Sequence, residues 1–385
     1  MLDKLMNNKY YNIARIGAYY LLVFSISVCT ILRFINWQDN CEPWIVPFVI
    51  NSLYALRKFF SMPVLLVTEV LYFIKVMIGK YDKKQLISAV IMSFLGIISL
   101  MATREIKTIY FISMIYFSKY ADFKKILDVH IIGKFLILIV LIVGNIFEIV
   151  YIAPQRGNGF GMVHYNTLSQ FLMFLMFALS CRFNRGNDKK VSFTLFSTVL
   201  AILCIYPIDS RTPVVILAMF VVLMWGEKFY NLIRPNIKKY IKFLFIVLPV
   251  LLTVMSWVLG ILVVDYGLKI DHNLSARFVE YVYAYREMGI KFFSRSLTIG
   301  NGTGLYYFDN QYARLIFDSG FIYCLVVFTG FIVLNYKVVK RDSYMLMIVL
   351  LCLYIDGTSG GLFDNELIVV LMTFIFAGDS IISLK

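Results

Sequence analysis

Charged side chains are scarce in this sequence. They make up 16% of the 385 residues, compared with about 25% in soluble domains. Hydrophobic residues make up 60%, whereas soluble domains contain roughly 45–50%. This balance excludes an ordinary soluble domain. It indicates an all-α protein that crosses a membrane several times, because many apolar runs can span the roughly 30 Å hydrocarbon layer.

Metal and nucleotide motifs are also missing. The six cysteines are scattered without paired spacing, which excludes a disulfide framework and a zinc motif as readings of the sequence. The phosphate-binding pattern GxxxxGK[ST] does not occur, and the predicted cytoplasmic connections are too short for a nucleotide-binding domain. We therefore expect no metal and no cofactor, and an ATP-driven pump would need a motor from another chain.

Apolar runs predict a single membrane domain over residues 1–385 with about twelve transmembrane helices. The run at 44–56 contains Pro47 and is short, so it reads as interfacial or re-entrant, and if it spans, every later segment reverses. The predicted spans are 16–35, 62–79, 85–101, 105–118, 131–150, 166–181, 192–207, 212–226, 243–264, 315–336, 343–356 and 366–381.

The net charge of +14 suggests nucleic acid at first sight, but its distribution favours a membrane explanation. Lys and Arg gather in alternate connections, such as "CRFNRGNDKK" and "EKFYNLIRPNIKKYIK", whereas 36–43 and 357–365 contain none. Basic connections stay in the cytoplasm. Both termini of this multi-pass protein are therefore predicted to be cytoplasmic, and we expect no nucleic-acid partner.

The first polar cluster on the predicted outer side is "QRGNGFGMVHYN", residues 155–166. Gly159 and Gly161 allow tight turns and close backbone approach, and Arg156 offers a bidentate partner for phosphate. The helix predicted near Asn166 directs its positive end at the same spot, beside His164. The alternative is an ordinary glycine-rich turn that ends in a helix cap at Asn166.

The second cluster, "YPIDSRTP" at 206–213, contains Arg211. The alternative reading is an interfacial arginine that pairs with Asp209 or with a lipid phosphate.

The third cluster lies in one large predicted extracytoplasmic loop, residues 265–314. Within it, "NLSARFVEYVYAYREMG" predicts a helix over 273–289, capped by Asn273 or Ser275 and ended by Gly289. A "GNG" turn and then Asp309 and Asn310 follow. The alternative is a surface helix with a glycine-rich turn.

The order of these features resembles the Wzy-type bacterial polysaccharide polymerases of the O-antigen ligase/polymerase superfamily. The shared features are an "R-x-x-GFG-x-x-x-x-N"-like outer loop, "SRT" two spans later, and a large loop with an "S-x-R" helix start, a "GNG" turn and "DN" before the next span. They cover about 60–380. Family members often have His-Pro-Asn where this chain has "HYN", so Tyr165 replaces the proline.

The resemblance implies a metal-independent glycosyltransferase. It would transfer a growing glycan from undecaprenyl pyrophosphate onto another lipid-linked repeat unit of a capsule, exopolysaccharide or O-antigen. The reaction would take place at the outer face of the bacterial cytoplasmic membrane. Arg156, Arg211 and Arg277 would stabilise the pyrophosphate leaving group. His272, Asp309 and Glu280 are candidates for the proton acceptor, with His272 ranked first.

Substrate binding would fall to Gly159, Gly161, His164, Asn166, Glu280, Tyr281, Asp309 and Asn310. Further partners would be membrane lipid, a chain-length regulator and a flippase. Two alternatives remain open at this stage. One is an O-antigen ligase-like glycosyltransferase, which differs in its acceptor, and the other is a flippase or transporter of lipid-linked oligosaccharides.

Overall fold

Apolar runs form helices in this protein, as expected where hydrocarbon offers the backbone no hydrogen-bond partner. The computed structural model describes residues 9–32, 35, 63–64, 66–68, 70–71, scattered positions from 87 to 101, and 107–147, 150, 160, 162, 165–183, 187–206, 208–268, 272–292, 310–358 and 366–377. In these ranges the regular structure is helical, apart from isolated bridge residues, among them an antiparallel bridge between Ile35 and Met162. The all-α prediction is confirmed.

Four of the described helices are long and apolar enough to cross a membrane. These candidate spans are Tyr10–Val28, Phe123–Ile146, Pro235–Tyr266 and Phe321–Lys340. They support a membrane protein. The total of twelve spans and the extracytoplasmic loop at 265–314 stay predictions. The runs at 44–56, 62–79 and 85–101 lie wholly or mostly outside the described residues.

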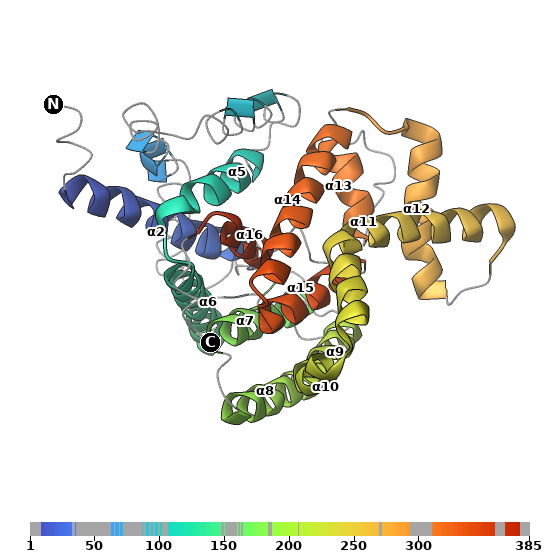
Figure 1. Cartoon of the computed structure of the whole chain (residues 1–385), viewed down its shortest axis with the longest axis horizontal. Helices are drawn as coiled ribbons and strands as arrows, with labels where there is room; N and C mark the ends of the chain where they lie inside the picture. Colours follow the sequence, from blue (N-terminus) through green and yellow to red (C-terminus); the bar gives the residue numbers. More distant parts are fainter. Residues whose placement is uncertain are drawn as a thin grey trace. The chain divides into compact units, whose positions relative to one another are not determined.

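The described residues fall into two compact units, and each is treated by itself. The first draws on Met1–Val90, Tyr110–Val221 and Val369–Lys385, and the second on Ile91–Ile109 and Val222–Ile368. The first unit contains all or most of α2 (Lys9–Leu32), α5 (Lys107–Phe117), α6 (Phe123–Ile146), α7 (Tyr165–Phe183), α8 (Asn187–Ile205) and α9 (Arg211–Trp225) (Figure 1).

Helices α2 and α6 pack with their chains running in the same direction. The Asp122 amide donates to the Tyr20 hydroxyl, and further along both helices Ser27 Oγ lies 2.7 Å from His130 Nδ1. Two helices that cross a membrane in the same direction need an odd number of crossings between them. The three spans predicted between them satisfy this condition.

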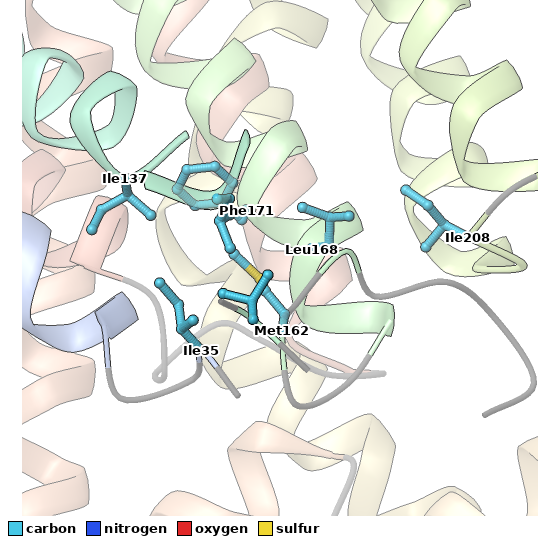
Figure 2. Packing of buried hydrophobic residues seen from close by; sticks show 8 residues of the cluster. Ile35, Ile137, Met162, Leu168, Phe171 and Ile208 are labelled. Carbon is cyan, nitrogen blue, oxygen red and sulfur yellow. The ribbon is translucent and has the colours of Figure 1, made fainter. Parts of the chain in front are cut away.

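Helix α7 returns antiparallel to α6. Arg182, near the end of α7, makes a two-point ion pair with Asp128, near the start of α6, through Nε–Oδ1 and Nη2–Oδ2 distances of 2.6 and 3.0 Å. At the other end of the pair, a buried cluster joins α6 and α7 to neighbouring segments. Met162 lies among Ile35, Leu168 and Phe171 (Figure 2). This cluster fixes the chain just before α7.

The second unit is built around α11 (Pro235–Tyr266). Its other helices are α10 (Glu227–Leu232), α12 (His272–Met288), α13 (Gln311–Ser319), α14 (Phe321–Lys340) and α15 (Tyr344–Asp356). α16 (Glu366–Met372) crosses the boundary between the units.

Proline interrupts the hydrogen-bond ladder of α11. Pro249 has no amide hydrogen, so the Phe245 carbonyl loses its usual partner four residues on. Asn335 of α14 supplies the replacement, because its Nδ2 donates to the carbonyls of Phe245 at 3.0 Å and Ile246 at 3.3 Å. Figure 1 shows α11 changing direction along its length. A buried amide on one helix thus satisfies the break in another.

Two predicted spans differ from the observed helices. The run at 315–336 is divided into α13 and α14, because Gly320 has a φ of 84° and ends the first helix. In the described part of the run at 366–381, the α-helix Glu366–Met372 gives way to a 3-10 turn, Thr373–Ile375, and residues 378–381 lie outside the described set. Hydropathy is continuous through both breaks, so it could not reveal them.

Candidate functional site

One polar residue from each of the first two predicted clusters meets the other in the first unit. Ser210 Oγ donates to Asn166 Oδ1 at 2.7 Å. Ser169, one turn along α7 from Asn166, places its Oγ 2.9 Å from both the Asn166 carbonyl oxygen and Ser210 Oγ. These three residues are called the Asn166 cluster. They link the start of α7 to the residue immediately before α9.

The turn that carries Ser210 is held in place by its own backbone. The Ser210 amide donates to the Cys204 carbonyl of α8 at 2.8 Å, and Ile208 packs into the cluster of Figure 2. Asp209 between them has a positive φ of 53°, which Asp tolerates better than most residues. This turn fixes Arg211 as the first residue of α9.

Arg211 is exposed, whereas Ser210 is buried. An exposed guanidinium at a helix N-terminus suits an anion, because the helix dipole and the first amides also favour negative charge. Ser210, the residue before Arg211 in the chain, belongs to the uncharged Asn166 cluster, in which the Ser169 and Ser210 hydroxyls bond to one another and to Asn166. An exposed positive charge therefore follows directly on an uncharged hydrogen-bonded cluster.

The remaining members of the first predicted cluster lie outside the described residues. They are Arg156, Gly159, Gly161 and His164. Of the site residues predicted in this motif, Asn166 is the one that the structure describes, together with the neighbouring Phe160 and Met162. The contact of Asn166 with Ser210 joins the motif to "SRT".

The second unit contains the third predicted cluster, and its helix is confirmed. α12 spans His272–Met288, and Gly289 follows it with a φ of 64°, as its predicted stop. Arg277 and His272 lie on this helix, but their side chains are outside the described set, as is Asp309 entirely. Glu280 is half-buried on α12.

Tyr281 and Asn310 are fully buried, and both bind Ser256 of α11. The Tyr281 hydroxyl donates to the Ser256 carbonyl, and Asn310 Nδ2 donates to Ser256 Oγ at 2.9 Å. Burial raises the pKa of the Tyr281 phenol, so it stays a hydrogen-bond donor at physiological pH. Asn310 Oδ1 also caps α13 by accepting from the amides of Tyr312 and Ala313.

Ser256 therefore ties two parts of the predicted large loop, the middle of α12 and the start of α13, to one point on α11. Trp257, the next residue, packs against the rings of Tyr281 and Phe317. An ion pair between Arg286 and Asp265 adds a second link between α12 and the end of α11. In this structure Tyr281 and Asn310 hold the loop, and their polar atoms face protein rather than an open pocket.

Sequence reasoning missed three residues whose side chains link helices or loop segments: Ser169, Ser256 and Asn335. Each is a small polar residue inside an apolar run, where it attracts no notice in a hydropathy profile. For Asn335 the sequence did contain a signal, Pro249, because a proline within a span requires a polar partner for the carbonyl that it frees.

In the part of the chain that the structure describes, no three His, Cys, Asp or Glu side chains gather to hold a metal ion. Comparisons with protein-family models, with curated proteins and with solved structures found no match for this chain.

Proposed function

We propose that this protein is a membrane glycosyltransferase that polymerises lipid-linked oligosaccharides. The support is the ordered set of motifs in the sequence, together with the contact between Asn166 and Ser210. That contact brings two motifs, 44 residues apart, to the base of an exposed arginine. The proposed site lies on the extracytoplasmic side of a bacterial cytoplasmic membrane.

In the proposed reaction, the bond between the growing glycan and undecaprenyl pyrophosphate breaks. A hydroxyl of the next lipid-linked repeat unit forms the new glycosidic bond and loses its proton to a base. Pyrophosphate on its lipid is the leaving group, so negative charge grows on the departing oxygen. Arg211, with Arg156 and Arg277, would stabilise that charge.

The roles of the other residues follow from their positions. Asn166, which is bonded to Ser210, the residue before Arg211, is assigned in this proposal to orienting a sugar hydroxyl or a phosphate oxygen. His272, Glu280 and Asp309 remain candidates for the proton acceptor. Tyr281 and Asn310 act as positioning residues in this proposal, because they hold the loop that carries these candidates.

The test is the Arg211→Ala variant in a strain that lacks its own copy of the gene, with membrane insertion confirmed. Loss of one stabilising donor typically lowers the rate by about 10²–10³, so gel analysis should show single repeat units in place of long polymer. The parallel variants Arg156→Ala and Arg277→Ala should give the same pattern.

Lys189→Ala is the matched control, because Lys189 is exposed at the opposite end of α8 from the Ser210 turn. It should leave chain length unchanged. Long lipid-linked chains that fail to reach their acceptor would instead indicate a ligase, and repeat units trapped inside the cell would indicate a flippase. Normal polymer in all three arginine variants would remove the proposed site.

A further inference from the structure

The corner between α9, α10 and α11 exposes large apolar side chains beside basic ones. Phe229 and Leu232 of α10 are 76% and 80% exposed, and Tyr240 of α11 is 70% exposed. Exposed basic residues alternate with them along the chain: Lys228, Arg234 and Lys239. These six residues are called the α10–α11 surface.

Basic residues outnumber acidic ones in the segments that form this corner. The segments 226–242 and 336–344 together contain eight Lys or Arg and two acidic residues, Glu227 and Asp342. Asp342 is engaged by Lys242, at 2.8 Å. The two segments therefore carry a net positive charge of six, eight basic minus two acidic residues, and Lys228, Arg234 and Lys239 are exposed.

The lysines that face the protein are separate from those on the surface. Lys238 places its Nζ 4.3 Å from the centre of the Tyr230 ring, and Lys242 pairs with Asp342. They hold α10 and α11 against the turn before α15. Arg234 and Lys239 point elsewhere, since both are exposed.

The local fold makes this corner stiff. α10 is a single short helix between Gly226 and Ile233, and Pro235 begins α11 directly after Arg234. The Tyr344 hydroxyl donates to the Leu223 carbonyl at the end of α9, at 2.8 Å. The exposed apolar and basic residues are thus presented on a fixed turn rather than on a loose tail.

We propose that the α10–α11 surface binds anionic phospholipid. Its apolar side chains would enter the acyl region while Lys228, Arg234 and Lys239 contact the headgroup phosphates, the pattern typical of membrane-surface helices. The positive charge complements the anionic cytoplasmic leaflet. The proposal depends on the membrane character of the chain and is independent of the proposed reaction.

The test uses the full-length protein in detergent micelles, titrated with phosphatidylglycerol or with phosphatidylcholine of the same acyl chains. Thermal unfolding is followed by tryptophan fluorescence. Phosphatidylglycerol should raise the unfolding midpoint at lower concentration than phosphatidylcholine. In the triple variant K228Q/R234Q/K239Q the half-saturating concentration should rise on the order of a hundredfold, at about fivefold per basic residue.

The matched control is K125Q/K189Q, which removes exposed lysines of the first unit and should keep the lipid preference. A second control needs no variant. For the unchanged protein, 0.5 M salt should reduce the rise of the unfolding midpoint that phosphatidylglycerol causes, because salt screens exposed charges. Equal midpoints with both lipids, or an unchanged triple variant, would overturn the proposal. So would equal stabilisation by poly-glutamate, which would point to an acidic protein partner instead.

Discussion

Replacing Asn335 by leucine tests how the break in α11 is stabilised. The substitution keeps the branching and the number of side-chain heavy atoms but removes both donations to α11 and the bond that Asn335 Oδ1 accepts from the Tyr354 hydroxyl at 2.8 Å. The carbonyl of Phe245 is then left buried without the donor that Pro249 cannot provide.

The expected cost follows from these bonds. An unsatisfied buried carbonyl costs about 1–3 kcal/mol, and an interhelical hydrogen bond in a membrane protein contributes about 0.6 kcal/mol on average. Asn335→Leu should therefore lower the free energy of unfolding by about 2–4 kcal/mol. Unfolding of the purified protein in mixed micelles by increasing SDS, followed by tryptophan fluorescence, measures the change.

A second substitution makes the test specific. Pro249→Ala restores an amide that can bond the Phe245 carbonyl, so Asn335→Leu should cost about 1 kcal/mol less in that background. Thr329→Val is the control on the same helix, because Thr329 is exposed and its hydroxyl bonds only within α14. Additive costs in the Pro249→Ala background, or equal costs for Asn335→Leu and Thr329→Val, would refute the reasoning.

Two further predictions concern packing. A Cβ added to Gly144 would lie 2.9 Å from Val150 Cγ1, so Gly144→Ala should destabilise the protein by about 1–3 kcal/mol, and Val150→Ala should recover part of that loss in the same SDS assay. Tyr281→Phe removes one bond to Ser256 and should cost about 1 kcal/mol, whereas Tyr281→Ala also empties a buried site and should cost about 3–5 kcal/mol. Equal losses in the two Tyr281 variants would contradict a packing role for this ring.

Helix positions were largely predictable because apolar periodicity and length carry that information. The run 131–150 corresponds to α6 and 343–356 to α15, with ends shifted by a few residues. The start of α6 at Phe123 was missed, because its first turn contains lysines that hydropathy assigns to a connection. The division at Gly320 was missed because one backbone angle, not composition, creates it.

The candidate site was predictable in part. Charge asymmetry predicted that Asn166 and the "SRT" motif share one membrane face, and their hydrogen-bonded contact agrees with that. Which atoms meet could not be predicted, because Ser169 and Ser210 look like any other small residues in a sequence. The roles of Tyr281 and Asn310 as ties to Ser256 depend on tertiary packing, which a single sequence does not reveal.

The parallel pairing of α2 with α6 has a consequence for biosynthesis. Ser27 and His130 are 103 positions apart, and a ribosome adds about 5–20 residues per second. α2 therefore leaves the ribosome roughly 5–20 s before its partner. During that interval the hydroxyl of Ser27 can bond the Val23 carbonyl of its own helix, as it does in the finished protein. Ser27 therefore has a hydrogen-bond acceptor within its own helix before His130 is synthesised, whereas the Tyr19 hydroxyl of the same helix gains the Met114 carbonyl as its acceptor only when that later segment has been made.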